Sequence, residues 1–134
     1  MNQRLLWIPR LAIAAVLGMT LPAKFTGAED AVALFTALGV EPWGRVALGV
    51  VEALLVVGIL LPQTWVLAAA LTTGLLGGAI LSHLTVLGVE VSDDGGALFA
   101  MALVGTASGA VITWMRRREL PVVGRWFGGS EGRN

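Results

Sequence analysis

The sequence predicts an all-α protein, a bundle of four transmembrane helices with a short amphipathic helix between the first and second spans. Of the 134 residues, 56% are hydrophobic and only 13% are charged, whereas soluble domains carry about 25% charged residues. The mean hydropathy is +0.81. Four apolar runs approach the roughly 20 residues that cross a bilayer. They fill one membrane domain, residues 1–118, and leave residues 119–134 as a cytoplasmic tail.

The first span is predicted over residues 9–25. Pro9 suits the first turn of a helix, where a missing N–H is no loss. This span is about 25 Å long at 1.5 Å per residue, which places Arg10 near one membrane surface and Lys24 near the other. A secretory signal peptide is the competing interpretation, with Arg4 before an apolar stretch. The absence of a clean A-x-A cleavage site after the stretch favours the span.

A short amphipathic helix is predicted between residues 26 and 41. Its apolar residues fall at positions i, i+3, i+4 and i+7, namely Ala31, Leu34, Phe35 and Leu38. Glu29 and Asp30 occupy its first turn, where the helix dipole favours negative charge. Two placements remain open: the helix lies on the membrane surface, or it packs against the bundle.

The other spans are predicted over residues 43–61, 65–88 and 96–115. Pro62 ends the second span and leaves a tight turn before the third. The third and fourth spans each carry a pair of glycines four residues apart, Gly74 with Gly78 and Gly105 with Gly109. Such pairs let two helix backbones approach closely, so we expect them to face one another across a seam.

The distribution of charge predicts an orientation in the membrane, and the composition excludes several kinds of site. Arginines gather at the two ends of the chain (Arg4, Arg10, Arg116, Arg117, Arg118 and Arg125), whereas acidic residues dominate the other loops. The positive-inside rule then predicts a multi-pass protein with both termini cytoplasmic, and we expect its membrane to be the bacterial cytoplasmic (inner) membrane. A net charge of zero gives no basic face for nucleic acid, and the absence of cysteine excludes disulfides, thiolate metal sites and CxxC redox chemistry.

Glu52 lies about halfway along the second span. An acid at that depth costs roughly 2.5 to 3.5 kcal/mol on insertion and by default marks a functional site. We place Glu52 about 13 Å, His83 about 7 Å and Lys24 within about 5 Å of the outer surface. The sequence therefore predicts contacts from Glu52 to His83 and from His83 to Lys24, directly or through water. A direct contact between Lys24 and Glu52 would need a fully extended lysine.

Each of these residues also has a purely structural interpretation. Lys24 can snorkel to the outer headgroups, and His83 can hydrogen-bond a neighbouring helix. Glu52 can be a protonated acid bonded to backbone or hydroxyl groups. Arg10 is interpreted as an anchor at the inner surface or as a cap at the bottom of the same cavity.

The chain resembles the DoxX and DoxX-like small membrane proteins. The residues that carry the resemblance are Arg10, the Gly18 to Lys24-Phe25 end of the first span, Leu38-Gly39-Val40-Glu41-Pro42, Gly49-Val50-Val51-Glu52, Gly78-Ala79 and Ser82-His83-Leu84. The glycine usual in the family before its lysine is replaced here by Leu21-Pro22-Ala23. The resemblance implies a four-helix membrane bundle and importance for Lys24, Glu52 and His83. It also implies links to quinone reactions or oxidative-stress complexes in some relatives.

The function predicted from these observations is an accessory or small-molecule-binding subunit of a membrane complex, with Lys24, Glu52 and His83 as a polar cluster that accepts a quinone-like molecule. The alternatives are a membrane subunit of a quinone-linked oxidoreductase, a purely structural assembly subunit, and a transporter. We expect no catalysis by the chain alone, no metal site and no cofactor held within the chain, with quinone as the candidate ligand. The expected partners are the lipid bilayer and either another membrane protein or further copies of this chain.

Overall fold

A computed structural model describes residues 2–121, and within them the chain is entirely helical, as predicted. Its elements are α1 (Trp7–Thr26), α2 (Glu29–Ala37), α3 (Trp43–Leu60), α4 (Trp65–Ser82), a π-helical turn η1 (His83–Leu87), α5 (Ala97–Met115) and a 3-10 turn η2 (Arg117–Glu119). Helices α1, α3 and α5 and the continuous segment Trp65–Leu87 are each long and apolar enough to cross a membrane. The four-span fold class is confirmed.

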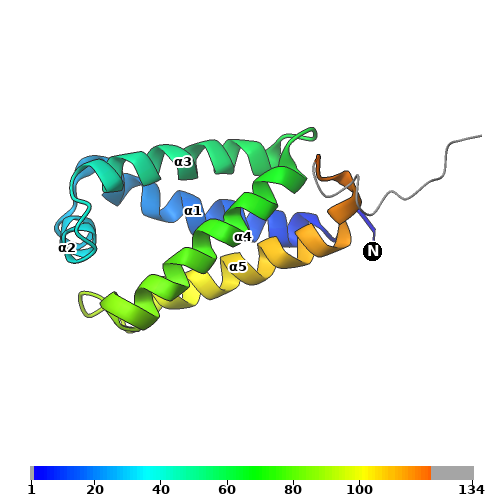
Figure 1. The fold of residues 1–134 in the computed structure, drawn as a ribbon. Coiled ribbons are helices and arrows are strands. Elements are labelled where there is room, and N and C mark those ends of the chain that lie inside the picture. The colour runs from blue at the N-terminus through cyan, green and yellow to red at the C-terminus, as the bar shows by residue number, and fades with distance from the viewer. Residues whose placement is uncertain (1, 122–134) are drawn as a thin grey trace, which may run out of the picture.

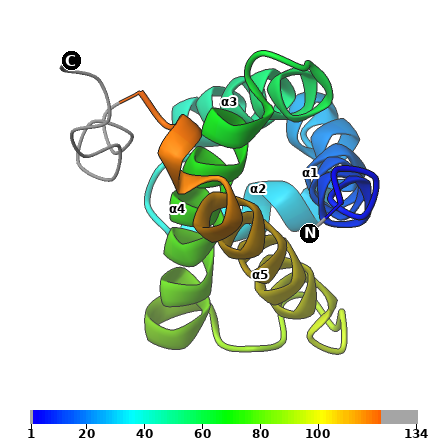
Figure 2. The same cartoon turned by 90° about the vertical axis from the view of Figure 1, so that its right-hand side faces the viewer.

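The four long helices form two pairs that diverge from a common end. Helix α1 packs along α3, and α4 packs along α5 (Figure 1). The pairs meet where the chain begins and where α5 ends, and the view along the bundle shows the helices surrounding a shared interior (Figure 2). Its core contains Leu6, Ile13, Leu17, Ile59, Ala69 and Ile112. At the opposite end the pairs separate, and α2 lies across the gap between them.

The predicted and observed boundaries differ most at the amphipathic helix. Helix α2 is only nine residues long, because glycines with positive φ end the helical path on either side, Gly27 at 69° and Gly39 at 75°. The tail is predicted to begin at residue 119, but Leu120 still packs in the core of the bundle. Residues 122–134 of that tail lie outside the described residues.

The predicted glycine seam is wrong for the third span. A Cβ built on Gly74 or Gly78 of α4 would meet nothing within 4 Å. On α5, by contrast, a Cβ on Gly109 would lie 2.8 Å from the Ala69 carbonyl oxygen, and one on Gly105 would collide with Leu76. The close approach of α4 and α5 therefore depends on the glycines of α5 alone, which face larger residues of α4.

Replacing Gly109 with alanine is expected to destabilise the protein by about 1–3 kcal/mol, because the added methyl group would meet backbone that cannot easily move. Gly74→Ala is the matched control, and its open surroundings predict an unchanged or slightly higher stability. The free energies of unfolding of both variants can be measured by denaturant titration in detergent micelles. Equal stabilities would contradict this account of the α4–α5 contact.

Candidate functional site

A cavity of about 670 Å³ lies between the two helix pairs, in the half of the bundle that α2 covers. All five helices contribute to its wall. Its polar and charged lining residues are Thr20, Lys24, Asp30, Glu52, Ser82, His83, Ser92 and Asp94, and the remainder of the wall is mostly apolar. Such a volume, with an apolar wall and a few polar groups, is typical of small-molecule sites.

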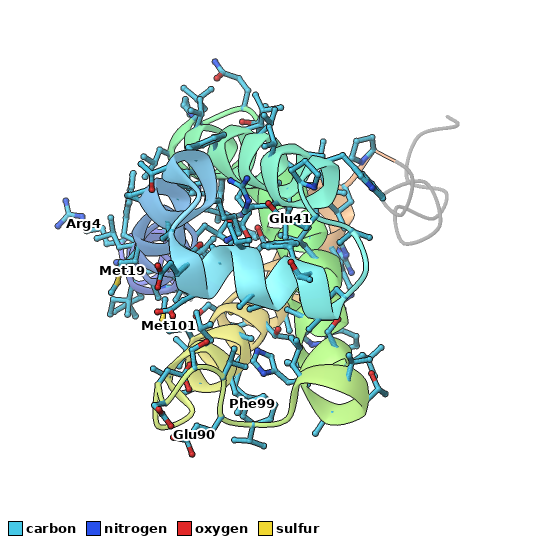
Figure 3. The ribbon with its side chains drawn as sticks, turned by 90° about the vertical axis from the view of Figure 1, so that its left-hand side faces the viewer. Arg4, Met19, Glu41, Glu90, Phe99 and Met101 are labelled. Atoms are coloured by element: carbon cyan, nitrogen blue, oxygen red, sulfur yellow. The ribbon has the colours of Figure 1, made fainter. Side chains whose placement is uncertain are left out.

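Helix α2 covers this cavity with its apolar face. The four residues that define its apolar stripe all line the cavity, namely Ala31, Leu34, Phe35 and Leu38, and Phe35 is buried. Viewed from this end of the molecule, α2 crosses in front of the divergent helices (Figure 3). Of the two placements left open by the sequence, the structure shows the packed one.

Lys24 and Glu52 form a direct ion pair at the cavity wall. Lys24 Nζ lies 2.7 Å from Glu52 Oε2 and donates a hydrogen bond to Thr20 Oγ1 at 2.8 Å. Thr20 Oγ1 in turn lies 3.3 Å from the same Glu52 oxygen. Lys24 is 8% exposed and Glu52 4% exposed. The ammonium group of Lys24 is therefore a direct partner of the Glu52 carboxyl group and is not directed outward to headgroups.

Two contacts explain why Lys24 reaches Glu52 directly. A Cβ built on Gly49 of α3 would lie 3.2 Å from the ring of Phe25 and 3.5 Å from Lys24 Cβ, so the glycine allows α1 and α3 to approach. Lys24 therefore lies beside Gly49, which is about 9 Å along α3 from Trp43. Glu52 is within reach of the lysine side chain from there. Arg45 donates to the backbone carbonyl of Lys24 in the last turn of α1.

Arg45 is itself fixed by Glu41. Its Nε lies 2.9 Å from Glu41 Oε1 and 3.0 Å from Oε2, a charge-assisted arrangement that holds the guanidinium in one orientation. Both residues belong to the turn and first helical turn that lead into α3. The pair therefore determines how the end of α1 is held, and with it the position of Lys24.

His83 lines the same cavity but does not bond to the ion pair. Its Nδ1 lies 2.8 Å from the Gly88 carbonyl oxygen, and its ring meets Phe99 edge to face with centroids 5.5 Å apart. The structure therefore shows no direct hydrogen bond from His83 to Lys24 or Glu52, and the predicted contact through water stays a prediction, since all three side chains line one cavity. The π-helical turn η1 starts at His83, and this departure from α-helical geometry sets the direction of the ring.

Arg10 lies at the other end of the bundle and is 7% exposed. Its Nε donates to the Ile59 carbonyl at 2.9 Å and its Nη2 to the Leu60 carbonyl at 3.2 Å. The guanidinium also stacks on Trp7 at 3.7 Å and on Trp65 at 4.6 Å. Arg10 thus satisfies the last carbonyls of α3, and it is neither in the wall of the cavity nor directed out to headgroups.

Four polar wall residues are not among the candidate site residues predicted from the sequence, namely Thr20, Asp30, Ser92 and Asp94. Thr20 could have been found, because it precedes Lys24 by one helical turn and so shares its face. Asp30 was assigned only to the first turn of α2. Asp94 precedes α5 in an Asp-Asp-Gly-Gly segment, a helix-start signal. Its Oδ1 accepts hydrogen bonds from the Val91 and Gly96 N–H groups and its Oδ2 from that of Leu98.

The backbone N–H groups of Leu98 and Val91 hold the pKa of Asp94 below its ordinary value. A carboxylate whose pKa is lowered by folding stabilises the protein above its unfolded pKa, about 3.9, and loses that contribution as the pH falls through the folded value. Asp94→Asn should therefore cost about 1 kcal/mol at neutral pH. Unfolding titrations should show the cost shrinking below about pH 4. Exposed Asp93 supplies the control, Asp93→Asn, and a cost that persists in acid would contradict this assignment.

No group of three or more histidine and acidic side chains within residues 2–121 is arranged to hold a metal ion. The polar groups of the cavity are instead one ammonium, carboxylates, hydroxyls and one imidazole. These groups can donate and accept hydrogen bonds and hold protons.

Comparison with known proteins gives one match. The DoxX-like family matches residues 8–92, which include α1 to α4, Lys24, Glu52 and His83. No curated protein and no solved structure matches the chain. Because the matched segment covers more than half of the sequence and coincides with a helical membrane bundle, the chain belongs to the DoxX-like family of small integral membrane proteins.

Proposed function

We propose that this protein is a binding subunit that holds a quinone-like molecule in the cavity beneath α2. One observation carries the proposal: a buried ion pair, Lys24 with Glu52, faces a cavity of about 670 Å³ with a mostly apolar wall. Ionisable groups inside a membrane bundle are costly and by default functional. An amphipathic ligand would bring its polar head to the charged groups and its apolar body to the leucines and Phe35.

The openings of the cavity support entry from the bilayer. Met19 of α1 and Met101 of α5 both line the cavity and lie on the same side of α2 in the view of Figure 3. Met19 is 71% exposed, on a helix whose outer face meets lipid. Methionine side chains are flexible and adapt to irregular ligands. A molecule dissolved in the bilayer therefore reaches the polar groups without leaving the membrane.

We infer a bacterial cytoplasmic membrane location with both termini cytoplasmic, which puts α2 and the cavity at the outer leaflet. The arginines before α1 and after α5 support this orientation, because the start of the chain and the end of α5 lie at the same end of the bundle. We also propose that the chain acts together with a membrane partner or with further copies of itself.

The test is gentle extraction of the protein from its native membrane, followed by mass spectrometry of the small molecules and proteins that accompany it. We expect the wild type to retain a quinone-like molecule, and Lys24→Met/Glu52→Gln, which removes both charges together, to lose it. Gly74→Ala lies away from the cavity wall and should retain it. If the wild type carries the same lipids as the double variant and nothing else, the binding function is wrong.

A further inference from the structure

The cavity presents hydrogen-bond acceptors that nothing in the described chain satisfies. His83 is 5% exposed, and its hydrogen bond to Gly88 uses only Nδ1. Because a carbonyl oxygen can only accept, Nδ1 carries a proton, and in the neutral imidazole Nε2 then keeps a lone pair. The Gly88 N–H also donates to the His83 carbonyl at 2.8 Å, so this residue is held at both its backbone and its ring.

Glu52 supplies the second acceptor. Its contacts with Lys24 and Thr20 both involve Oε2, which leaves Oε1 without a hydrogen-bond donor among residues 2–121. The sealed polar side-chain atoms that lack a partner in this part of the chain are the hydroxyls of Thr72, Thr106 and Thr113. Glu52 Oε1 and His83 Nε2 are not among these fully enclosed atoms, and both residues line the cavity.

Donors in the same wall are nearly all in use. The Ser82 hydroxyl donates to the Gly78 carbonyl, and the single hydroxyl proton of Thr20 is shared between Leu17 and Glu52. Lys24 uses two of its three N–H groups on Thr20 and Glu52. The buried and half-buried side chains of the wall therefore offer a ligand two good acceptors and one spare N–H, and the exposed residues Asp30 and Ser92 add a carboxylate and a hydroxyl.

We propose that the cavity selects the reduced, hydroxyl-bearing form of its ligand, a hydroquinone, with His83 Nε2 and Glu52 Oε1 accepting hydrogen bonds from its O–H groups. The inference rests on the proposed function, that the cavity holds a quinone-like molecule. An oxidised quinone carries only carbonyl acceptors and would leave His83 and Glu52 unsatisfied. A site built to bond a hydroxyl discriminates strongly against an analogue without it, because its buried polar groups then remain unpaired.

Three probes that share one ring test this selectivity: tetramethylbenzoquinone, its hydroquinone, and the dimethyl ether of that hydroquinone. Equilibrium dialysis of the detergent-purified protein, under anaerobic conditions and against empty micelles, measures their dissociation constants. We expect the hydroquinone to bind about tenfold more tightly than the quinone and the ether to bind no better than the quinone. Equal affinities for quinone and hydroquinone would overturn the selectivity and leave the binding function standing. Binding of none of the probes would overturn both.

Two substitutions at His83 separate its two nitrogens. His83→Asn keeps an amide N–H near the position of Nδ1 and removes the acceptor at Nε2, so it should abolish most of the preference for hydroquinone while binding of the quinone changes little. His83→Gln places an amide oxygen near Nε2 and should keep the preference. Thr85→Ala, whose hydroxyl bonds only within its own helix at Leu81, is the control. A full preference in His83→Asn would overturn the role of Nε2.

Discussion

Replacing Glu52 with glutamine is expected to destabilise the protein by about 3 kcal/mol, because the ammonium of Lys24 would remain buried without its counter-ion. The replacement keeps the shape of the side chain, so the loss reports the charge and not a cavity. Lys24→Met should cost a similar amount, since it leaves the carboxylate of Glu52 unpaired. The free energy of unfolding in detergent micelles, followed by helical circular dichroism, measures each variant.

The double variant Lys24→Met/Glu52→Gln distinguishes this explanation from simple loss of packing. With both charges removed no buried ion remains, so the double variant should be more stable than either single variant. The excess over additivity gives the coupling energy of the pair. Additive single effects would show that the two side chains act independently, against the 2.7 Å contact between them.

Replacing Arg10 with alanine is expected to cost about 2–4 kcal/mol, since it removes two charge-assisted hydrogen bonds and the stacking on two tryptophans. The carbonyls of Ile59 and Leu60 at the end of α3 would also lose their donors. Because Arg10 lies outside the cavity wall, ligand affinity measured on the folded fraction should stay unchanged. A thermal melt and the dialysis assay together check both expectations.

Arg10→Lys is the informative control for this position. Lysine keeps the positive charge, but it lacks the planar fork that bonds two carbonyls and stacks on the tryptophan rings. It should therefore recover less than half of the stability lost in Arg10→Ala. Full recovery by lysine would mean that Arg10 acts only through its charge, as an anchor at the membrane surface would.

The fold was predictable because each span is encoded locally. The apolar run between Trp43 and Pro62 predicts a helix, and α3 occupies almost the same residues. The spacing of the apolar residues from Ala31 to Leu38 predicts α2, and it also identifies the face that α2 buries. The sequence could not say what that face covers, since an apolar stripe fits a lipid surface and a protein interior equally well.

Some wall residues of the cavity could be named from the sequence, but their contacts could not. Lys24 and Glu52 attract notice as charges in apolar runs, but their pairing depends on the approach of α1 to α3 at Gly49. The environment of His83 depends on the π-helical turn η1, and no local sequence pattern predicts this turn. The glycine pairs show the same limit, because Gly105 and Gly109 lie in the helix contact whereas Gly74 and Gly78 do not.

The sequence by itself determined that this protein is a four-helix membrane bundle of the DoxX-like family with a few ionisable groups inside it. Hydrophobicity and length suffice for the four-helix bundle, since a bilayer accepts a long apolar helix whatever its neighbours are, whereas the family follows from the matched sequence of residues 8–92. Only the tertiary structure decided that Lys24 pairs with Glu52, that Arg10 caps α3, and that α2 covers the cavity. These contacts depend on how each helix is rotated and tilted against the others, which is fixed by side-chain packing between residues far apart in the chain.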